Sequence, residues 1–414
     1  MGSIFIKVRE FPTKSETFVL GQMEVITQLG YDLRVLVNKK NELSVSSNPE
    51  LVKKLDVMNR VTVLPIDSSS RFLKRGWLIL KGLLKLPPLR SLKLLSTRRY
   101  GEAAIRGRYL LEYLSLRKKI SGQVVHVQFG DNVGSLDKYK ELNLVDFKLI
   151  VTFHGYDAHF TDDNFEMKRM EYKRLFEVGD FFTCNTSFLA SKLIALGCPE
   201  KKLRIMPVPP NAMMFLQGYV KRELGDVLNL VSVGRLIELK GHGYGLMVVK
   251  ELLDKGVKVK YTIVGEGDQL DELQKLVSEL SIESNVTFLG ALAQQEIKEL
   301  LDRMDIFLMP SVTDRHGRQE AQGVVVLEAQ ACGIPVIAFS SGGLSDVVQH
   351  GETGFLVEER NVLSMTEAVL QLFNNSALYK IMSEQARSYV IKYFSQEKSI
   401  ERWNEVYKKL LSER

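Results

Sequence analysis

The feature that most constrains the fold is an alternation of short apolar runs with amphipathic stretches, which occurs twice along the chain. In the first half, apolar runs predict strands at 3–8, 32–37, 61–65, 124–129, 147–154 and 181–185, with helices between them, for example at 16–29 and 164–178. In the second half, predicted strands at 228–234, 259–265, 286–290, 305–311 and 335–339 alternate with predicted helices at 242–255, 268–279, 294–303 and 323–332. Continuous Val/Ile/Leu strands that alternate with helices favour parallel sheets covered on both faces.

Three prolines within residues 207–210 separate the two alternations. Proline fixes φ and removes a backbone donor, so the stretch from Pro207 to Tyr219 is predicted to be a linker. A chain of 414 residues also exceeds what one core usually holds. We therefore expect an α/β protein of two Rossmann-like, doubly wound domains, at 1–208 and 209–390. Residues 391–414 are expected to form a helix that packs back towards the N-terminal domain, with Trp403 and Tyr407 in its core face.

Composition excludes several classes of protein. The chain is 45% hydrophobic and 26% charged, which is typical of a soluble globular protein and excludes disordered and collagen-like classes. No apolar run reaches the roughly 20 residues of a spanning helix, and the N-terminus lacks the organisation of a signal peptide. Three scattered cysteines and six histidines give no disulfide framework and no metal-ligand spacing. A cytoplasmic protein without a metal cofactor is expected.

The positive charge gathers between Arg71 and Lys119, where fourteen Lys/Arg residues face two acids. Bulky apolar residues such as Phe72, Trp77 and Leu83 are interleaved with these cations. A basic amphipathic segment of this kind favours an anionic membrane surface. The alternatives are a solvated helical face whose lysine stems pack against apolar residues, and a nucleic-acid site, for which no recognition motif is present.

A basic pair follows the first strand of the second half. Gly234, Arg235 and Lys240 lie between that strand and a helix predicted to begin near Gly241. A strand end, a glycine turn and a helix N-terminus together favour an anion, and an Arg with a Lys suits a pyrophosphate. A surface loop with stray cations is the alternative.

The next turn of the second half contains Gly265, Glu266 and Gly267 and predicts a close backbone approach to a flat ligand. Such glycine-rich loops are common in α/β proteins, so on its own this is a weak signal.

Two glutamates, Glu320 and Glu328, lie eight positions apart around the start of a predicted helix. The helix N-terminus near Gln322, Gly323 and Val324 would offer free amides to a phosphate or a sugar hydroxyl. Glu328, inside the helix, suits the two hydroxyls of a ribose, whereas Glu320, further out, suits a transferred sugar. A hydrolase with paired carboxylates is the competitor, but such an enzyme has no use for a separate anion site.

In the first half, His126 and His154 lie at or near the ends of predicted strands, where ligand sites form. A histidine in a strand is often merely packed, and this alternative is stronger for His126 than for His154. Asp157, three residues after His154, is a candidate for contact with an acceptor or a sugar.

Taken in order, "VGRLIELKG" (233–241), "IVGEG" (263–267), the Glu320/Glu328 pair, "EAQACGIPVIAF" (328–339) and "GGLSDVVQHGETGFLV" (342–357) resemble the retaining glycosyltransferases of family four, which have the GT-B fold. "FPTKSETFV" (11–19), "VVHVQFGDN" (124–132) and "TFHGYDAH" (152–159) are similar to the exopolysaccharide branch of that family, which makes colanic acid and amylovoran. The resemblance spans most of the chain, and the motifs of the second half are the more specific.

The resemblance implies roles for particular residues. Arg235 and Lys240 would neutralise the donor diphosphate without a metal, Glu328 would bind the ribose, and Glu320 would approach the donor sugar. His154 would lie near the reacting carbon. Many family members carry two glycines in the first strand–helix loop, which contact the diphosphate. Here Ser15, Glu16 and Thr17 occupy that turn, with Ser15 as a possible helix cap.

The expected activity is transfer of a hexosyl group from a nucleoside-diphosphate sugar, with UDP favoured and GDP next, to a saccharide or lipid-linked acceptor. Retention by front-face attack is implied by the family, and the basic segment would hold the enzyme on the inner face of the membrane. Two alternatives stay open at this point, a nucleotide-sugar epimerase on the same fold and a non-catalytic scaffold at the membrane.

Overall fold

The computed structural model describes residues 2–13, 17–46, 48–65, 89–105, 107–218 and 223–412. The expectations placed on Ser15, on Glu16 and on residues 71–88 of the basic segment lie outside these ranges.

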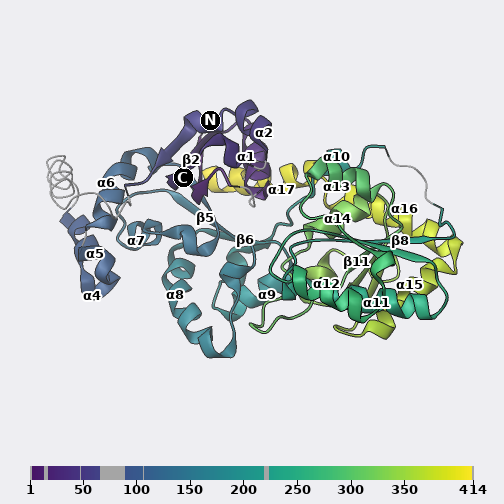
Figure 1. The fold of residues 1–414 in the computed structure, drawn as a ribbon. Coiled ribbons are helices and arrows are strands. Elements are labelled where there is room, and N and C mark those ends of the chain that lie inside the picture. Colours follow the sequence, from purple (N-terminus) through teal and green to yellow (C-terminus); the bar gives the residue numbers. More distant parts are fainter. Residues whose placement is uncertain are drawn as a thin grey trace.

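The N-terminal half contains a parallel sheet in the order β3-β2-β1-β4-β5-β6-β7 (Figure 1). Its strands are β1 (Ser3–Phe11), β2 (Asp32–Lys40), β3 (Val61–Val63), β4 (Val124–Gln128), β5 (Lys148–Phe153), β6 (Phe181–Cys184) and β7 (Leu203–Ile205). The central strands β4 and β5 are buried along nearly their whole length, as parallel strands covered by helices on both faces must be. The order reverses between β1 and β4, and this switch point is where open parallel sheets bind ligands.

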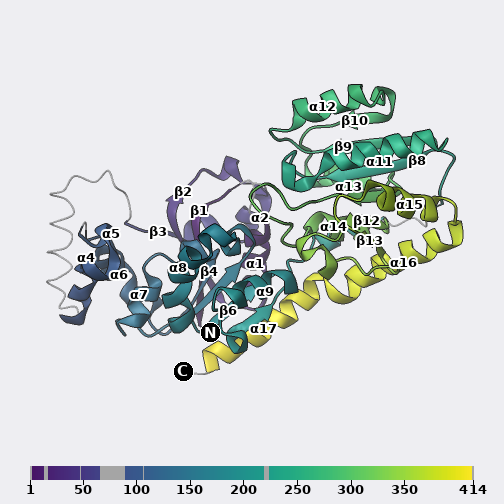
Figure 2. The ribbon, with the colours of Figure 1, turned by 90° about the horizontal axis from the view of Figure 1, so that it is seen from below.

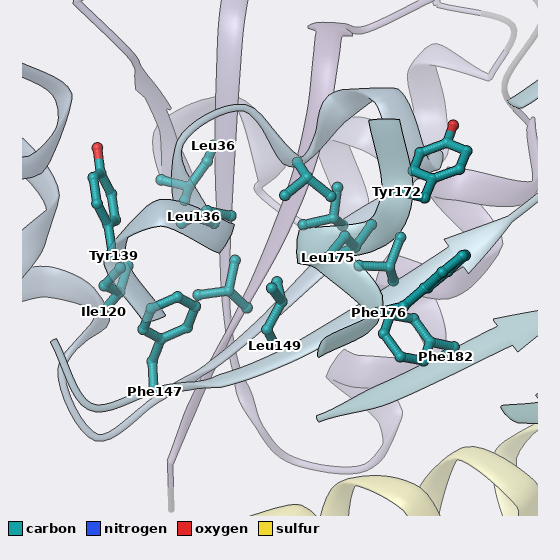
Figure 3. Packing of buried hydrophobic residues seen from close by; sticks show 14 of the residues in the cluster. Leu36, Ile120, Leu136, Tyr139, Phe147, Leu149, Tyr172, Leu175, Phe176 and Phe182 are labelled. Carbon is teal, nitrogen blue, oxygen red and sulfur yellow. The ribbon is translucent and has the colours of Figure 1, made fainter. Parts of the chain in front are cut away.

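Helices cover both faces of this sheet. One face packs against α1 (Thr17–Gln28), α2 (Pro49–Lys54) and α17 (Gln396–Ser412). The other face packs against α6 (Arg108–Ile120), α7 (Leu136–Glu141), α8 (Phe165–Val178) and α9 (Ser187–Ala195). Figure 3 shows this second layer, in which Leu136 and Tyr139 of α7 and Leu175 and Phe176 of α8 lie over Leu149 and Phe182 of the strands. The short helices α4 (Thr97–Tyr100) and α5 (Glu102–Ile105) lie at the edge remote from the C-terminal half.

The C-terminal half forms a second parallel sheet in the order β10-β9-β8-β11-β12-β13. Its strands are β8 (Leu228–Val233), β9 (Val259–Val264), β10 (Val286–Phe288), β11 (Ile306–Met309), β12 (Val336–Phe339) and β13 (Gly354–Val357). On one face lie α11 (His242–Asp254), α12 (Leu270–Glu279) and α15 (Val362–Phe373). On the other lie α10 (Ala212–Phe215), α13 (Gln294–Leu301), α14 (Val324–Ala331) and α16 (Ser376–Tyr393). The expectation of two parallel, doubly wound α/β domains is confirmed.

Three elements differ from the sequence-based expectations. The strands β7 and β13 were not predicted, because β7 contains Arg204 beside a run of charged residues and β13 has only three apolar residues between Gly354 and Glu358. The predicted linker contains α10, whose Phe215 is fully buried in the core of the C-terminal half. The connection between the halves is therefore shorter than the proline-rich stretch indicated.

The chain crosses back to the N-terminal half at its end. Helix α16 packs on α14, and α17 then runs beneath the first sheet (Figure 2). Trp403 and Tyr407 are 5% and 0% exposed and belong to the same apolar cluster as Ile4, Ile6 and Val8 of β1. Burial of aromatic side chains of this size is the main contribution that holds such a helix in place.

Candidate active site

The carboxyl ends of both sheets face one interdomain cleft, which contains two neighbouring cavities. The first has a volume of about 250 Å³ and lies between α1, α17, the Pro207–Asn211 connection and the start of α14. The second has a volume of about 410 Å³ and lies between the loops after β5, β8 and β11 and the start of α9. His154 lines both. Volumes of this order match small-molecule sites.

Arg235, Lys240 and Glu320 line the second cavity together with Gly234. The Lys240 ammonium donates to a Glu320 carboxylate oxygen at 2.5 Å, and the two side chains are only 15% and 12% exposed. The Arg235 side chain is exposed and makes no salt bridge to any residue within the described ranges. The structure thus brings together, from segments 80 positions apart, the three charged groups that the sequence pointed to.

Glu328 lies in α14 and lines the first cavity with Val324, Thr17 and Gln294. Its residue is 7% exposed, and burial raises the pKa of its carboxyl from an ordinary 4.5 to about 8. No hydrogen bond or ion pair joins this carboxylate to another described part of the chain. A buried carboxylate without a donor is a group that a ligand's hydroxyls would satisfy.

The loop that carries Glu320 is held by backbone packing. Gly343 donates its N–H to the Glu320 carbonyl at 2.8 Å, and a Cβ on Gly343 would lie 2.2 Å from the Ala321 carbonyl oxygen. Gln322 uses its side chain on the connection between the domains, accepting from Val208 N at 3.0 Å and donating to Val208 O at 2.8 Å. The Gln322 side chain therefore joins the two domains, while the ligand contact expected of the backbone amides at the start of α14 stays a prediction. Gly323, with φ +77°, is the N-cap of α14.

His154 follows β5 and is partly buried between the rings of Phe18 and Phe129, at centroid distances of 4.2 and 4.7 Å. Burial lowers the pKa of its imidazole to about 3, so the ring is neutral near pH 7. Its Nε2 lies 2.8 Å from Gln128 Oε1. Gly155, at φ +140°, allows this loop to meet the opposite domain, because a Cβ there would lie 2.8 Å from that of Ala321.

Asp157 is 1% exposed and accepts hydrogen bonds from three backbone amides, Gly130 N at 2.8 Å and His154 N and Gly155 N at 3.0 Å each. Burial raises the pKa of its carboxyl to about 6, against the opposing effect of those three donors. It lines neither cavity. The expected contact with a sugar does not fit this position, and Asp157 instead fixes the backbone on which His154 stands.

One further expectation needs correction, and two others stay predictions. His126 has no exposed surface and is bonded to Tyr407, Thr152 and Gln128 inside the domain, so it cannot touch an acceptor. Gly265 and Glu266 line neither cavity. A Cβ on Gly265 would lie 1.9 Å from the Gly234 carbonyl oxygen, so this glycine serves the contact between two strand-end loops.

Several residues that were not proposed as site residues also line the cleft. Gln128, Phe18 and Trp403 line the first cavity, and Tyr156 and Lys192 line the second. A signal existed for Gln128, since it lies near the end of a predicted strand two positions after His126 and so shares its face. Trp403 was expected in the core face of its helix, and the tertiary fold places it at the first cavity as well.

Polar contacts join the two walls of the cleft, one formed by the N-terminal domain and the other by the C-terminal domain. Asp346 accepts from Ser187 N at 2.8 Å and from Ser187 Oγ at 2.7 Å, at the start of α9. Thr186 Oγ1 donates to the Ala321 carbonyl at 2.8 Å. These contacts place the loop that carries Glu320 against the N-terminal half.

The described residues contain no group of three or more His, Cys, Asp or Glu side chains placed to hold a metal ion. They also contain no helix that is both long and apolar enough to cross a membrane.

The chain is similar to known proteins over most of its length. Residues 221–389 match the family model of the glycosyl transferases group 1. The chain is 28% identical over 376 residues to the amylovoran biosynthesis glycosyltransferase AmsK of Erwinia amylovora, covering 89% of this chain and 90% of that one. It is 26% identical to the putative colanic acid biosynthesis glycosyltransferase WcaL of Salmonella typhimurium, covering 94% and 95%.

Among solved structures, Anabaena Alr3699/HepE in complex with UDP and glucose superposes with a TM-score of 0.71 at 14% identity, covering 99% of this chain and 100% of that one. The glycosyltransferase from Rickettsia africae superposes with a TM-score of 0.70 at 17% identity, covering 99% of both chains. The chain is therefore a glycosyltransferase with the GT-B fold, and residues 221–389 of its C-terminal half are similar to the glycosyl transferases group 1.

Proposed function

We propose that the protein transfers a hexosyl group from a nucleoside-diphosphate sugar to a saccharide or lipid-linked acceptor, with retention at the anomeric carbon, during synthesis of a bacterial extracellular polysaccharide. UDP is the favoured nucleotide, and GDP is the next. The relatives named for amylovoran and colanic acid synthesis support the pathway class. The fold neighbour that holds UDP and glucose is compatible with the donor class.

The observation that carries the proposal is the grouping of Arg235, Lys240 and Glu320 with His154 around one cavity. In glycosyl transfer the sugar gains positive charge while the leaving diphosphate gains negative charge. A guanidinium can grip a phosphate through two parallel hydrogen bonds, and an ammonium has three donors, of which Glu320 uses one. Arg235 and Lys240 would thus stabilise the leaving group electrostatically, which removes the need for a metal in this proposal.

Glu320 and Glu328 would have different tasks. Glu320 is oriented by Lys240 and would accept hydrogen bonds from hydroxyls of the transferred sugar. Glu328 would accept from the two ribose hydroxyls, which would supply the donors that its carboxylate lacks. Lys240 would therefore both orient Glu320 and contact the diphosphate. Recognition of the transferred sugar and recognition of the diphosphate would thus be linked through one side chain.

Thermal unfolding in the presence of nucleotides tests this proposal. UDP, GDP, UDP-glucose and GDP-mannose would each be added at rising concentration to the wild type, Arg235→Ala, Glu328→Ala and the exposed-site control Lys275→Ala. A ligand at about 100 times its dissociation constant should add roughly 2.7 kcal/mol to the wild type and the control, and little to the other two variants. Absence of stabilisation by every nucleotide would contradict the donor class. Equal stabilisation of all variants would contradict the placement of the site.

We further propose that the N-terminal domain rests on an anionic membrane surface through the basic segment at 71–119. Within its described part, Leu89 and Leu92 are 85% and 44% exposed and alternate with the exposed cations Arg90 and Lys93. These residues directly precede α4, at the edge of the N-terminal domain remote from the C-terminal half (Figure 1). Exposed leucines beside cations fit a lipid interface better than water, because the leucines insert while the cations meet anionic headgroups.

Vesicle flotation tests the membrane proposal. Leu89→Ser with Leu92→Ser, and separately Arg90→Glu with Lys93→Glu, should each reduce binding to vesicles that contain phosphatidylglycerol. Each cation contributes about 1 kcal/mol near such a surface. The control is Leu363→Ser, which removes a leucine that is 60% exposed on α15 of the other domain. Unchanged binding of both double variants would contradict this surface as the contact.

A further inference from the structure

Gln128, the last residue of β4, bridges the two histidines of the N-terminal domain. Its side chain is buried, with Oε1 lying 2.8 Å from His154 Nε2 and Nε2 lying 3.1 Å from His126 Nε2. His126 Nδ1 in turn lies 2.8 Å from the hydroxyl of Tyr407. A continuous hydrogen-bonded chain therefore runs from the C-terminal helix α17 to the residue that lines both cavities.

The donors and acceptors of this chain follow from the chemistry of its members. An amide oxygen only accepts, so His154 must carry its proton on Nε2 to donate to Gln128 Oε1. An amide nitrogen only donates, so His126 Nε2 must be unprotonated. His126 then holds its proton on Nδ1 and donates it to Tyr407 Oη. Thr152 Oγ1, at 2.7 Å, gives a second donor to His126 Nε2.

Tyr407, at the end of this series of hydrogen bonds, is also held in place by its neighbours. Tyr407 has no exposed surface, and its hydroxyl also accepts from Gln22 Nε2 at 2.8 Å. The ring of Trp403 lies 5.3 Å from that of Tyr407 and 4.8 Å from that of His126. Three helices and strands far apart in the sequence (α1, β4 and α17) thus fix one amide orientation.

We propose that Gln128 is a positioning residue that fixes His154 as the Nε2–H tautomer, so that the Nδ1 lone pair is available to a ligand in the cleft. His126 and Tyr407 hold the Gln128 side chain in the orientation that this requires. His154 Nδ1 makes no hydrogen bond to a described residue, while its ring lines both cavities. A neutral imidazole with a free lone pair accepts a hydrogen bond from a hydroxyl, and sugar hydroxyls are the ligands expected in this cleft. The inference rests on the proposed function of that cleft.

The C-terminal helix gains a role in this arrangement. It belongs to a segment that leaves the C-terminal domain, yet its Tyr407 supports a residue of the opposite wall. A loss of the Tyr407 hydroxyl would leave the buried Nδ1–H of His126 without its acceptor. His126 would then favour its other tautomer, which turns its Nε2 from an acceptor into a donor and repels the Gln128 NH₂ group.

Nitrogen-15 spectra of the histidine rings test the tautomer directly and need no substrate. The chain has only six histidines, and His154→Asn assigns the signal of His154. In the wild type at pH 7–8, His154 should be protonated on Nε2 alone. In Gln128→Leu the same ring should populate both tautomers, and in Tyr407→Phe the His126 signal should change tautomer. The control, Tyr379→Phe, removes a buried tyrosine hydroxyl that donates to the Asp305 carbonyl in the other domain, and should change neither signal.

A pH series of Gln128→Glu separates positioning from general damage to the fold. A carboxylate beside His154 favours the imidazolium, so the pKa of His154 should rise from about 3 towards neutrality. Donor turnover, measured as nucleotide release from the sugar nucleotide that binds, should then fall as the pH drops below about 7, with no such fall in the wild type. The other ionisable groups that line the two cavities are Glu24, Glu328, Tyr156, His159, Lys192, Arg235, Lys240, Arg318 and Glu320.

The expected loss in kcat for Gln128→Leu is roughly tenfold, which corresponds to one hydrogen bond that orients a reacting group. An Nδ1–H tautomer of His154 in the wild type, or a tautomer indifferent to Gln128→Leu, would overturn the inference. Unchanged turnover in His154→Asn with the expected spectra would instead overturn the proposed role of His154 and leave the positioning chain intact.

Discussion

The two walls of the cleft present different groups. The C-terminal wall presents charged side chains on strand-end loops, with Arg235 exposed and Lys240 paired to Glu320. Around His154 the N-terminal wall presents neutral groups, the imidazole itself between aromatic rings and the amide of Gln128 behind it, and Lys192 adds a cation to the second cavity. A charged wall opposite the neutral groups around His154 is compatible with the proposed donor, which carries a diphosphate, and with the proposed acceptor, which offers a hydroxyl.

The walls also differ in what holds them. Backbone contacts fix the C-terminal wall, since Gly343 and Gly265 let neighbouring loops touch. Buried side chains fix the N-terminal wall, since Asp157 binds three amides and His126 binds Tyr407. Substitutions in the first wall should therefore affect chemistry while the fold survives, whereas those in the second should affect stability and chemistry together.

The largest effect is expected from the cations of the C-terminal wall. Arg235→Ala and Lys240→Ala should each lower kcat by about 10²–10³, or about 2.7–4 kcal/mol, because each removes a charge aimed at the leaving diphosphate. The unfolding midpoint of Arg235→Ala should stay close to that of the wild type, because this side chain is exposed, whereas that of Lys240→Ala should fall, because the mostly buried Glu320 carboxylate loses its partner. Steady-state nucleotide release measures the first quantity and thermal denaturation the second, with Lys275→Ala as the control. If kcat fell less than tenfold in both variants, the expectation that substitutions in the C-terminal wall mainly affect chemistry would be contradicted.

Asp157→Asn changes the N-terminal wall and should lower both stability and turnover. The amide replaces one carboxylate oxygen with an NH₂ group that faces backbone N–H donors, at a cost of roughly 1–3 kcal/mol in unfolding free energy. Turnover should fall as well, because the His154 backbone loses an anchor. Chemical denaturation and turnover would be measured on the same preparation. Loss of turnover at full stability would place Asp157 in direct contact with substrate instead.

Much of the fold was predictable because parallel strands buried on both faces leave continuous apolar runs. Such runs at β1, β4, β5, β8 and β9 gave the alternation. The strand β7 is interrupted by Arg204, β13 has only three apolar residues after Gly354, and α10 directly follows a proline-rich stretch, so these three elements lack that signal. Its Phe215 is buried by tertiary contacts that proline content does not report.

The charged residues of the C-terminal wall were predictable because of their charge. A cation or a carboxylate at a strand end lacks a structural explanation in the sequence, so Arg235, Lys240, Glu320 and Glu328 stood out. The neutral wall was not predictable in this way. His126 and Asp157 have the side chains of catalytic residues but are fully enclosed, and Gln128 has an unremarkable side chain but lines the cleft. Only the fold separates these cases.

Glu328→Gln should increase stability while it weakens nucleotide binding. The folded pKa of about 8 lies above the ordinary 4.5, so the folded state holds a proton that the unfolded state has lost between these values. The free energy of unfolding therefore falls as the pH rises from about 4.5 to about 8. The neutral amide avoids this loss, and the gain at pH 8–9 should be roughly 1–3 kcal/mol, with little gain below pH 5.

Denaturation curves at pH 5 and pH 8.5 would measure this difference, with the exposed Glu367→Gln of α15 as the control. A gain that is equal at both pH values would contradict ionisation of Glu328 as its cause. A variant that binds nucleotide as tightly as the wild type would show that the ribose does not use this carboxylate. His154 stays neutral over the same range, whereas burial raises the pKa of Asp157 in the N-terminal wall to about 6. Because Asp157 is present in both proteins, the difference between Glu328→Gln and the wild type reports on Glu328.

The smallest effect should come from the contact that joins the walls. Asp346 lies in the C-terminal domain but accepts from the Ser187 backbone and hydroxyl in the first turn of α9, beside the N-cap Thr186, so it satisfies a helix-end N–H of the other domain. Asp346→Ala should cost about 1 kcal/mol, as loss of an N-cap does, and should widen the average separation of the domains. Asn375→Ala removes the cap of α16, whose side chain accepts from Leu378 N at 3.0 Å within one domain. It should cost a similar free energy without changing the radius of gyration in small-angle X-ray scattering. An identical scattering profile for both variants would mean that Asp346 stabilises α9 only, and that the two walls are held together by Gln322 and Val208.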